Sequence, residues 1–186
     1  LMLRAFDIPH NTHLIGLYSG TMADDLAHMP LARLVPALNT PHGHTQDSLA
    51  MAEYLHEQHP DKGLWPRDPA QRMRARWLVS ELHSGFSHLR GDCPGDLLGQ
   101  MPDFKPSEGV LKDVARIQDL WASSFDMSGS DGWLFGEYSI ADVFYAPIAG
   151  RIANYNLPMS DRATAYVEKH LSDPLFRQWR ALGLTK

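Results

Sequence analysis

Two short segments constrain the fold of this chain more than any other feature. Residues 34–38 read Leu-Val-Pro-Ala-Leu, and residues 46–50, about a dozen positions later, read Gln-Asp-Ser-Leu-Ala. Proline has no N–H to donate, so a cis Val35-Pro36 bond would turn the chain sharply and leave the N–H and C=O of Val35 unpaired. An ordinary trans proline that opens a strand at 37–40 is the alternative.

Asp47 and Ser48 lie where a helix is predicted to begin. Apolar residues follow them at helical spacing, namely Leu49, Ala52 and Leu55. The first N–H groups of a helix lack partners and attract a carboxylate. The Ser48 hydroxyl can add to that carboxylate and Asp47 can hold an ammonium, whereas the alternative for Asp47 is a simple N-cap. Together, the two segments predict a binding site for the backbone of a small peptide.

A second helix start is predicted at residues 139–142, Ser-Ile-Ala-Asp, which precede an apolar run. Ser139 can bond the N–H of Asp142 while Asp142 reaches back to the N–H of Ser139, which makes a capping box. Gly136 stands three residues ahead. We expect a structural role for this box.

The chain resembles the glutathione S-transferases in Val35-Pro36, in residues 47–55 and in the box after Gly136. The resemblance implies an α+β fold, with a thioredoxin-like α/β domain at 1–60, a linker at 61–67 and an all-helical bundle domain at 68–186. It also implies that the first domain is incomplete, because the family's first strand and the start of its first helix would precede Leu1.

The resemblance implies the roles of the site residues. In the family, the residue before a cis-proline pairs with the cysteinyl part of glutathione, and an acid-serine pair holds the γ-glutamyl end. The predicted glutathione-binding residues are therefore Leu34, Val35, Pro36, Asp47 and Ser48. Glutathione is expected as co-substrate.

A helix predicted at 68–89 is similar to that of bacterial beta-class transferases, through residues 71–74 and 80–87. That class places a histidine near the glutathione thiol, and His83 matches it as a tentative catalytic residue. Glu81 matches an acid that in the class leans toward the ligand of the partner subunit, so it is added to the predicted glutathione-binding residues. The resemblance to the family also implies a homodimer. Ser84 stands where the class commonly has lysine. A surface histidine and glutamate remain the alternative.

Composition excludes several classes of partner. The 186 residues are 44% hydrophobic with a formal charge of −5, and basic residues are scattered among acids, so we expect no nucleic-acid or membrane partner. A single cysteine, Cys93, precludes a disulfide within the chain and suggests a cytoplasmic location. We interpret Cys93 as a free thiol that is not a nucleophile. We interpret His42 and His44 as residues of a hairpin tip, so no metal site is expected.

The remaining pattern predicts further elements. We expect the end of a helix at 1–6, a strand at 13–17, a short helix at 23–28, a hairpin at 37–40 and 44–46, and a helix at 47–59. In the second part, helices are expected after Ser107, at 139–154, after Ser160 and from 173 to Gly183.

These features predict a glutathione S-transferase that conjugates the glutathione thiolate to small hydrophobic electrophiles, as in detoxification. We expect the electrophile between the two domains, near the first half of the helix at 68–89. The family's thiol-activating residue is expected upstream of Leu1, so the catalytic nucleophile or activator is unknown. A non-catalytic binding or interaction module and a maleylacetoacetate-type isomerase are the alternatives.

Overall fold

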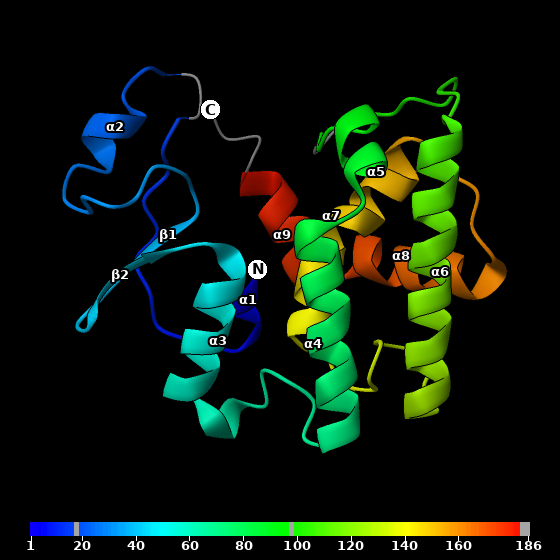
Figure 1. Cartoon of the computed structure of the whole chain (residues 1–186), viewed down its shortest axis with the longest axis horizontal. Coiled ribbons are helices and arrows are strands. Elements are labelled where there is room, and N and C mark those ends of the chain that lie inside the picture. Colours follow the sequence, from blue (N-terminus) through cyan, green and yellow to red (C-terminus); the bar gives the residue numbers. More distant parts are fainter. Residues whose placement is uncertain (17–18, 97–98, 183–186) are drawn as a thin grey trace.

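The computed structural model describes residues 1–16, 19–96 and 99–182, and Figure 1 shows a small N-terminal part beside a larger helical part. The N-terminal part contains the elements α1 (Met2–Ala5), α2 (Met22–Asp25), β1 (Ala37–Thr40), β2 (Gly43–Gln46), α3 (Ser48–Gln58) and the 3-10 turn η1 (Pro60–Lys62). The helical part contains α4 (Pro69–Ser84), α5 (Ser87–Asp92), α6 (Glu108–Ser128), α7 (Ile140–Asn154), α8 (Asp161–Ser172) and α9 (Pro174–Leu182). The predicted α+β order is confirmed.

The hairpin of β1 and β2 is the only sheet in the described ranges, and its register pairs Ala37 with Gln46 and Thr40 with Gly43. This confirms the predicted hairpin. The strand predicted at 13–17 is wrong over 13–16, which take no strand conformation, and Leu17 lies outside the described residues. Alternating side chains favour an extended chain, but a strand also needs a partner for its N–H and C=O groups.

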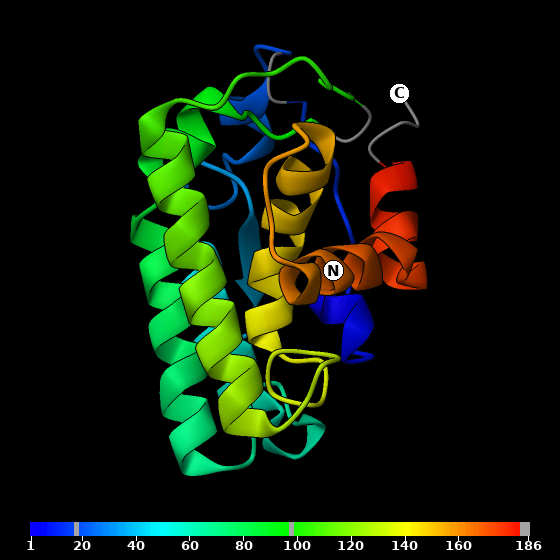
Figure 2. The ribbon, with the colours of Figure 1, turned by 90° about the vertical axis from the view of Figure 1, so that its right-hand side faces the viewer.

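The two long helices α4 and α6 lie side by side, as Figures 1 and 2 both show. Asp68 caps α4 by accepting the N–H of Gln71, and Ser107 caps α6 by accepting the N–H of Val110. Both caps are helix starts that the sequence predicts. They satisfy donors that a helix cannot pair internally.

The prediction of one helix over 68–89 is wrong at Gly85, where α4 ends before α5 begins. A Cβ at Gly85 would lie 2.6 Å from the carbonyl oxygen of Glu81, so a larger residue would collide with the backbone. Phe86 follows with φ at 55°, in the left-handed region. The turn buries the side chains of Phe86 and Leu89, whose apolar area compensates for the broken helix.

One hydrophobic core connects the N-terminal part to the helices. It includes Ala52 and Leu55 of α3, the fully buried Leu64 and Trp65 of the connecting segment, and the inner faces of α4, α6 and α7. The backbone N–H of Ile140 donates to the carbonyl of Leu64 at 2.8 Å. The segment that connects the two parts is therefore packed into the shared core. The assignment of residues 61–67 as a linker between two domains stays a prediction.

The predicted capping box at the start of α7 is present, and its acid is completely buried. The carboxylate of Asp142 accepts the N–H groups of Ser139 and Leu134 and the hydroxyls of Ser139 and Tyr166, at 2.9–3.1 Å. Burial raises the pKa of Asp142 to about 6, against the lowering effect of these donors. Gly136, with φ at 88°, provides the left-handed turn that leads into the box.

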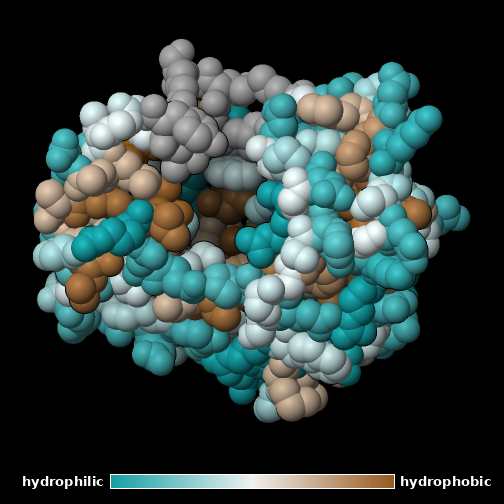
Figure 3. Space-filling model, turned by 45° about the horizontal axis from the view of Figure 1, so that its top comes forward, coloured by the Kyte–Doolittle hydropathy of each residue, from teal (hydrophilic) through white to brown (hydrophobic). Residues whose placement is uncertain are grey.

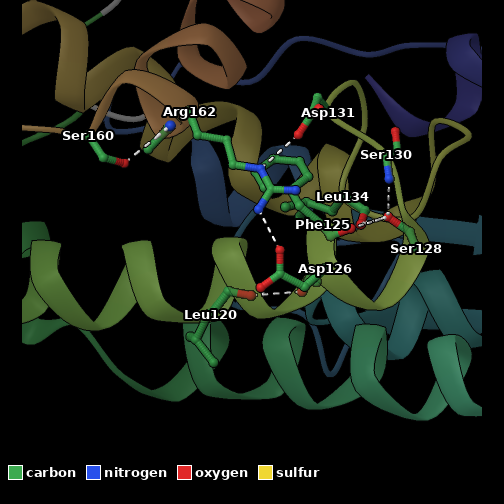
Figure 4. A network of polar contacts seen from close by, with 11 residues as sticks. Leu120, Phe125, Asp126, Ser128, Ser130, Asp131, Leu134, Ser160 and Arg162 are labelled. Atoms are coloured by element: carbon green, nitrogen blue, oxygen red, sulfur yellow. Dashed lines mark hydrogen bonds and ion pairs between the residues drawn. The ribbon is translucent and has the colours of Figure 1, made fainter.

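A surface network holds α8 against the end of α6 (Figure 4). The guanidinium of Arg162 binds the carboxylate of Asp126 at 2.6 Å and that of Asp131 at 2.8 Å, and it lies 4.9 Å from the ring centroid of Phe125. Nearby, the hydroxyl of Ser128 donates to the carbonyl of Leu134. Because both acids are exposed, the network fixes geometry more than it adds stability.

Within the described residues, none of the helices is long and apolar enough to span a bilayer.

We predict that Asp142→Ala lowers the free energy of unfolding by about 3 kcal/mol or more, because it leaves buried donors of Leu134, Ser139 and Tyr166 unpaired. Urea denaturation followed by circular dichroism measures this. Ser160→Ala, which removes the partly exposed cap of α8, should cost only about 1 kcal/mol. Equal losses in both variants would contradict the role given to the buried network.

Candidate functional site

The Val35-Pro36 peptide bond is cis. Neither the N–H nor the C=O of Val35 has a hydrogen-bond partner within the described residues, and its side chain is half-buried. The backbone at Val35 therefore presents one donor and one acceptor, which is what an extended peptide ligand requires.

Gln46 supports this segment, and sequence reasoning missed that role. Its side-chain oxygen accepts the backbone N–H of Arg33 at 2.6 Å and that of Leu34 at 2.8 Å. Leu34 therefore uses its N–H within the protein, while 60% of its surface is exposed. The sequence held one signal for this role, because Gln46 is a polar residue at a strand position where an apolar residue is common.

Asp47 caps α3 from an unusual backbone conformation. Its φ is 82°, and its Oδ1 accepts the N–H of Leu49 at 2.8 Å and that of Ala50 at 3.1 Å. The N-cap interpretation of Asp47 is thus confirmed. A non-glycine residue at positive φ is costly and marks a position that the surrounding structure must hold.

Ser48 is the first residue of α3, and it lines the same cavity as Pro36. The pair of Ala37 with Gln46 is the last of the hairpin ladder, so the cis bond and the start of α3 follow at the same end of the two strands. Over the described part of the chain, the N–H and the hydroxyl of Ser48 have no hydrogen-bond partner. Two donors at a helix N-terminus form a suitable seat for a carboxylate.

His83 of α4 binds Asp47 directly. Its Nε2 lies 2.7 Å from Oδ2 of Asp47, and the two side chains are 36% and 45% exposed. Slight burial raises the pKa of Asp47, but the N–H groups of Ala50 and Leu49, together with His83, outweigh it and lower the pKa. The structure thus places His83 against the acid that was predicted to hold the γ-glutamyl end; its predicted position near the thiol stays a prediction.

Glu81 points away from His83, as its helical spacing suggests. Its carboxylate accepts from the guanidinium of Arg116 on α6 at 2.7 and 3.0 Å, and from the indole of Trp77 at 2.9 Å. The hydrogen bond from Arg116 lowers the pKa of Glu81. The contacts with Arg116 join α4 to α6, and the role of Glu81 toward a partner's ligand stays a prediction.

An apolar cavity of about 500 Å³ lies between the two parts and borders this site. Pro36 and Ser48 are among its lining residues. Most of the others are hydrophobic and come from the N-terminal part, α7 and α9, among them Leu3, Leu38, Met51, Phe144 and Trp179. Figure 3 shows the molecule hollowed between the two parts, with hydrophobic surface inside the hollow. No residue of α4 lines this cavity.

Cys93 is buried and forms no disulfide. Burial raises the pKa of its thiol to about 11, and the charge of Asp92 adds to the effect. Because the thiolate is the reactive form, this environment makes Cys93 a poor nucleophile, as interpreted from the sequence.

Comparison with known structures identifies the fold. A Burkholderia glutathione transferase homologue with bound glutathione superposes with a TM-score of 0.70 at 23% identity, covering 96% of this chain and 85% of that one. A Methylococcus capsulatus glutathione transferase gives 0.66 at 21% identity, covering 98% and 91%. A beta-class transferase from Sphingomonas chungbukensis gives 0.55 at 21% identity, covering 86% and 78%.

The chain therefore has the fold of the glutathione transferases, a thioredoxin-like domain followed by a helical domain, and the resemblance seen in its motifs is confirmed. Among curated proteins, a probable maleylacetoacetate isomerase of Caenorhabditis elegans is 28% identical over 169 residues, which cover 88% of this chain and 76% of the relative. No family model matches the chain.

Proposed function

We propose that the protein binds glutathione at Val35, Asp47 and Ser48 and transfers its thiolate to a small hydrophobic electrophile. One observation carries this proposal: among the described residues, the backbone of Val35 and the donors of Ser48 have no hydrogen-bond partner. A glutathione transferase homologue of the same fold binds glutathione in its structure, which supports the choice of ligand. A cytoplasmic location is part of the proposal and rests on the single cysteine.

The ligand's chemistry matches each group. The cysteinyl N–H and C=O of glutathione would pair with the C=O and N–H of Val35, as a short extra strand does. The γ-glutamyl carboxylate would accept from the N–H and hydroxyl of Ser48, and the ammonium would lie near Asp47. His83 would then be a positioning residue that orients Asp47. Leu34 and Pro36, which flank Val35, would position its backbone for this pairing.

We predict that Ser48→Ala weakens glutathione binding by roughly 10- to 100-fold, since a hydrogen bond to a charged group contributes about 1.5–3 kcal/mol. Isothermal titration calorimetry measures the affinity. Ser172→Ala, a hydroxyl at the far end of α8 that bonds only the carbonyl of Lys169, is the matched control and should leave the affinity unchanged. An unchanged affinity of Ser48→Ala for glutathione would overturn the proposed carboxylate-binding role of Ser48.

The reaction requires the thiolate, because the neutral thiol is a weak nucleophile. With 1-chloro-2,4-dinitrobenzene, the sulfur would form a bond to the ring carbon and chloride would leave with the bonding electrons. The electrophile would occupy the apolar cavity between the two parts, next to Ser48. None of the described residues is assigned the role of activating the thiol.

A maleylacetoacetate-type isomerase is the second candidate, favoured by the relative from Caenorhabditis elegans. The thiolate would add to the cis double bond, the resulting single bond would rotate, and elimination would return glutathione unchanged.

We expect glutathione-dependent turnover with 1-chloro-2,4-dinitrobenzene, measured by absorbance of the conjugate. Glutathione-dependent turnover of maleylacetoacetate, with no turnover of 1-chloro-2,4-dinitrobenzene, would instead support the isomerase candidate. Glutathione binding without either activity would identify a non-catalytic binding module and overturn the transferase proposal.

We propose that α4 forms a homodimer interface. Met73 and Trp77 are 69% and 49% exposed on one face of this helix, and the guanidinium of Arg74 lies 4.8 Å from the ring of Trp77. Apolar and aromatic residues bordered by arginine are typical of interface centres.

Light scattering should give a mass of about twice 20.9 kDa, and Trp77→Glu should give the monomer mass, because it places a charge in the apolar centre. A monomer before substitution would contradict the proposal.

A further inference from the structure

A second cavity, of about 320 Å³, lies at the far end of α7. It is lined by the loop that follows α5, by α7 and by α9. Its lining residues include Gly95, Pro147, Arg151, Phe176 and Trp179. None of the residues proposed to bind glutathione lines it. Trp179 is shared with the larger cavity, so α9 forms a wall between the two.

Arg151 is a partly buried cation held only by carbonyl groups. Its Nε donates to the carbonyl of Cys93 at 2.9 Å and its Nη1 to the carbonyl of Pro147 at 3.3 Å. Across the described residues, no carboxylate lies within ion-pair distance of Arg151, and its Nη2 has no acceptor. Burial, reinforced by the charge of Arg90, lowers the pKa of Arg151. An anion in the cavity would offset this unfavourable environment.

Gly95 leaves the free side of the guanidinium open. A Cβ at this position would lie 3.1 Å from Nη2 of Arg151, which is closer than most side chains pack, and 3.5 Å from its Cζ, which is an ordinary contact. The loop is fixed in this place because Asn154 donates to the carbonyl of Asp96 and Tyr155 donates to that of Pro94. The fixed conformation of this loop therefore keeps Nη2 of Arg151 accessible.

Two aromatic rings form much of the rest of the cavity lining. The rings of Phe176 and Trp179 lie 5.5 Å apart, and the guanidinium of Arg180 lies 6.0 Å from the ring of Phe176. Asp96 is the only acid among the lining residues, and its carboxylate accepts the N–H of Gly99 at 2.9 Å. The guanidinium of Arg151, which lines the cavity without an ion-pair partner among the described residues, and the two aromatic rings favour an anionic ligand with an apolar body.

We propose that this cavity binds a small aromatic monocarboxylate. The carboxylate accepts hydrogen bonds from Nη2 of Arg151, and the ring lies against Trp179 and Pro147. The site is separate from the glutathione site and does not depend on the function proposed for that site. The cavity volume is at the lower end of the range for ligand sites, which fits a ligand with one ring.

The test uses 4-fluorophenylacetate and its uncharged analogue 4-fluorophenylacetamide, each titrated against the whole protein and followed by fluorine NMR. The acid should bind at least tenfold more tightly than the amide, because only the acid compensates the charge of Arg151. Saturating glutathione should not displace it. Equal affinities for the two compounds, or displacement by glutathione, would overturn the proposal.

Two variants locate the binding. Arg151→Met should lower the affinity for the acid to that for the amide. Since it also removes the bond to the carbonyl of Cys93, Gly95→Ala provides the second test: it keeps the charge, crowds Nη2 and should weaken binding of the acid severalfold with an unchanged unfolding temperature. Arg162→Met, which removes a surface arginine elsewhere, is the control. A preference for the acid that survives in both Arg151→Met and Gly95→Ala would place the ligand elsewhere and overturn the site.

Discussion

The rest of the structure depends on the buried carboxylate of Asp142. It joins the start of α7 to the turn at Leu134 and to Tyr166 of α8, so three segments that are distant in sequence meet at one side chain. Two residues before it, Ile140 donates to Leu64, the buried residue that connects the two parts of the chain. A capping box is a local motif, but here its acid determines where the N-terminal part meets the helices.

The candidate site is assembled across that junction. Arg76 of α4 binds both carboxylate oxygens of Glu53 on α3, at 3.0 and 2.9 Å, and His83 binds Asp47 at the start of α3. These two pairs connect the helix that carries Ser48 to the helical part. The position of the proposed carboxylate seat is therefore set by both parts of the protein, although every residue proposed to contact glutathione belongs to the first.

The sequence predicted the site where its chemistry is local. A proline after Val35 and an acid followed by serine at a helix start are recognisable because the backbone groups they affect lie within one or two residues. The roles of Gln46 and His83 were not predicted in the same way, since their partners lie 12 or 13 and 36 residues away. The break at Gly85 was missed because helical periodicity continues through it, and only the collision of a Cβ with the Glu81 carbonyl requires the glycine.

The sequence by itself determined most of the helices, the hairpin, the caps at Asp47, Asp68, Ser107 and Ser160, and the resemblance to the glutathione transferases. These depend on short-range steric and hydrogen-bonding preferences. Only the tertiary structure decided that His83 engages Asp47 and that Glu81 engages Arg116. It also decided that Arg151 lines a cavity and has no carboxylate within ion-pair distance among the described residues. Such pairings depend on how distant helices pack, and packing is a property of the whole core that local sequence does not encode.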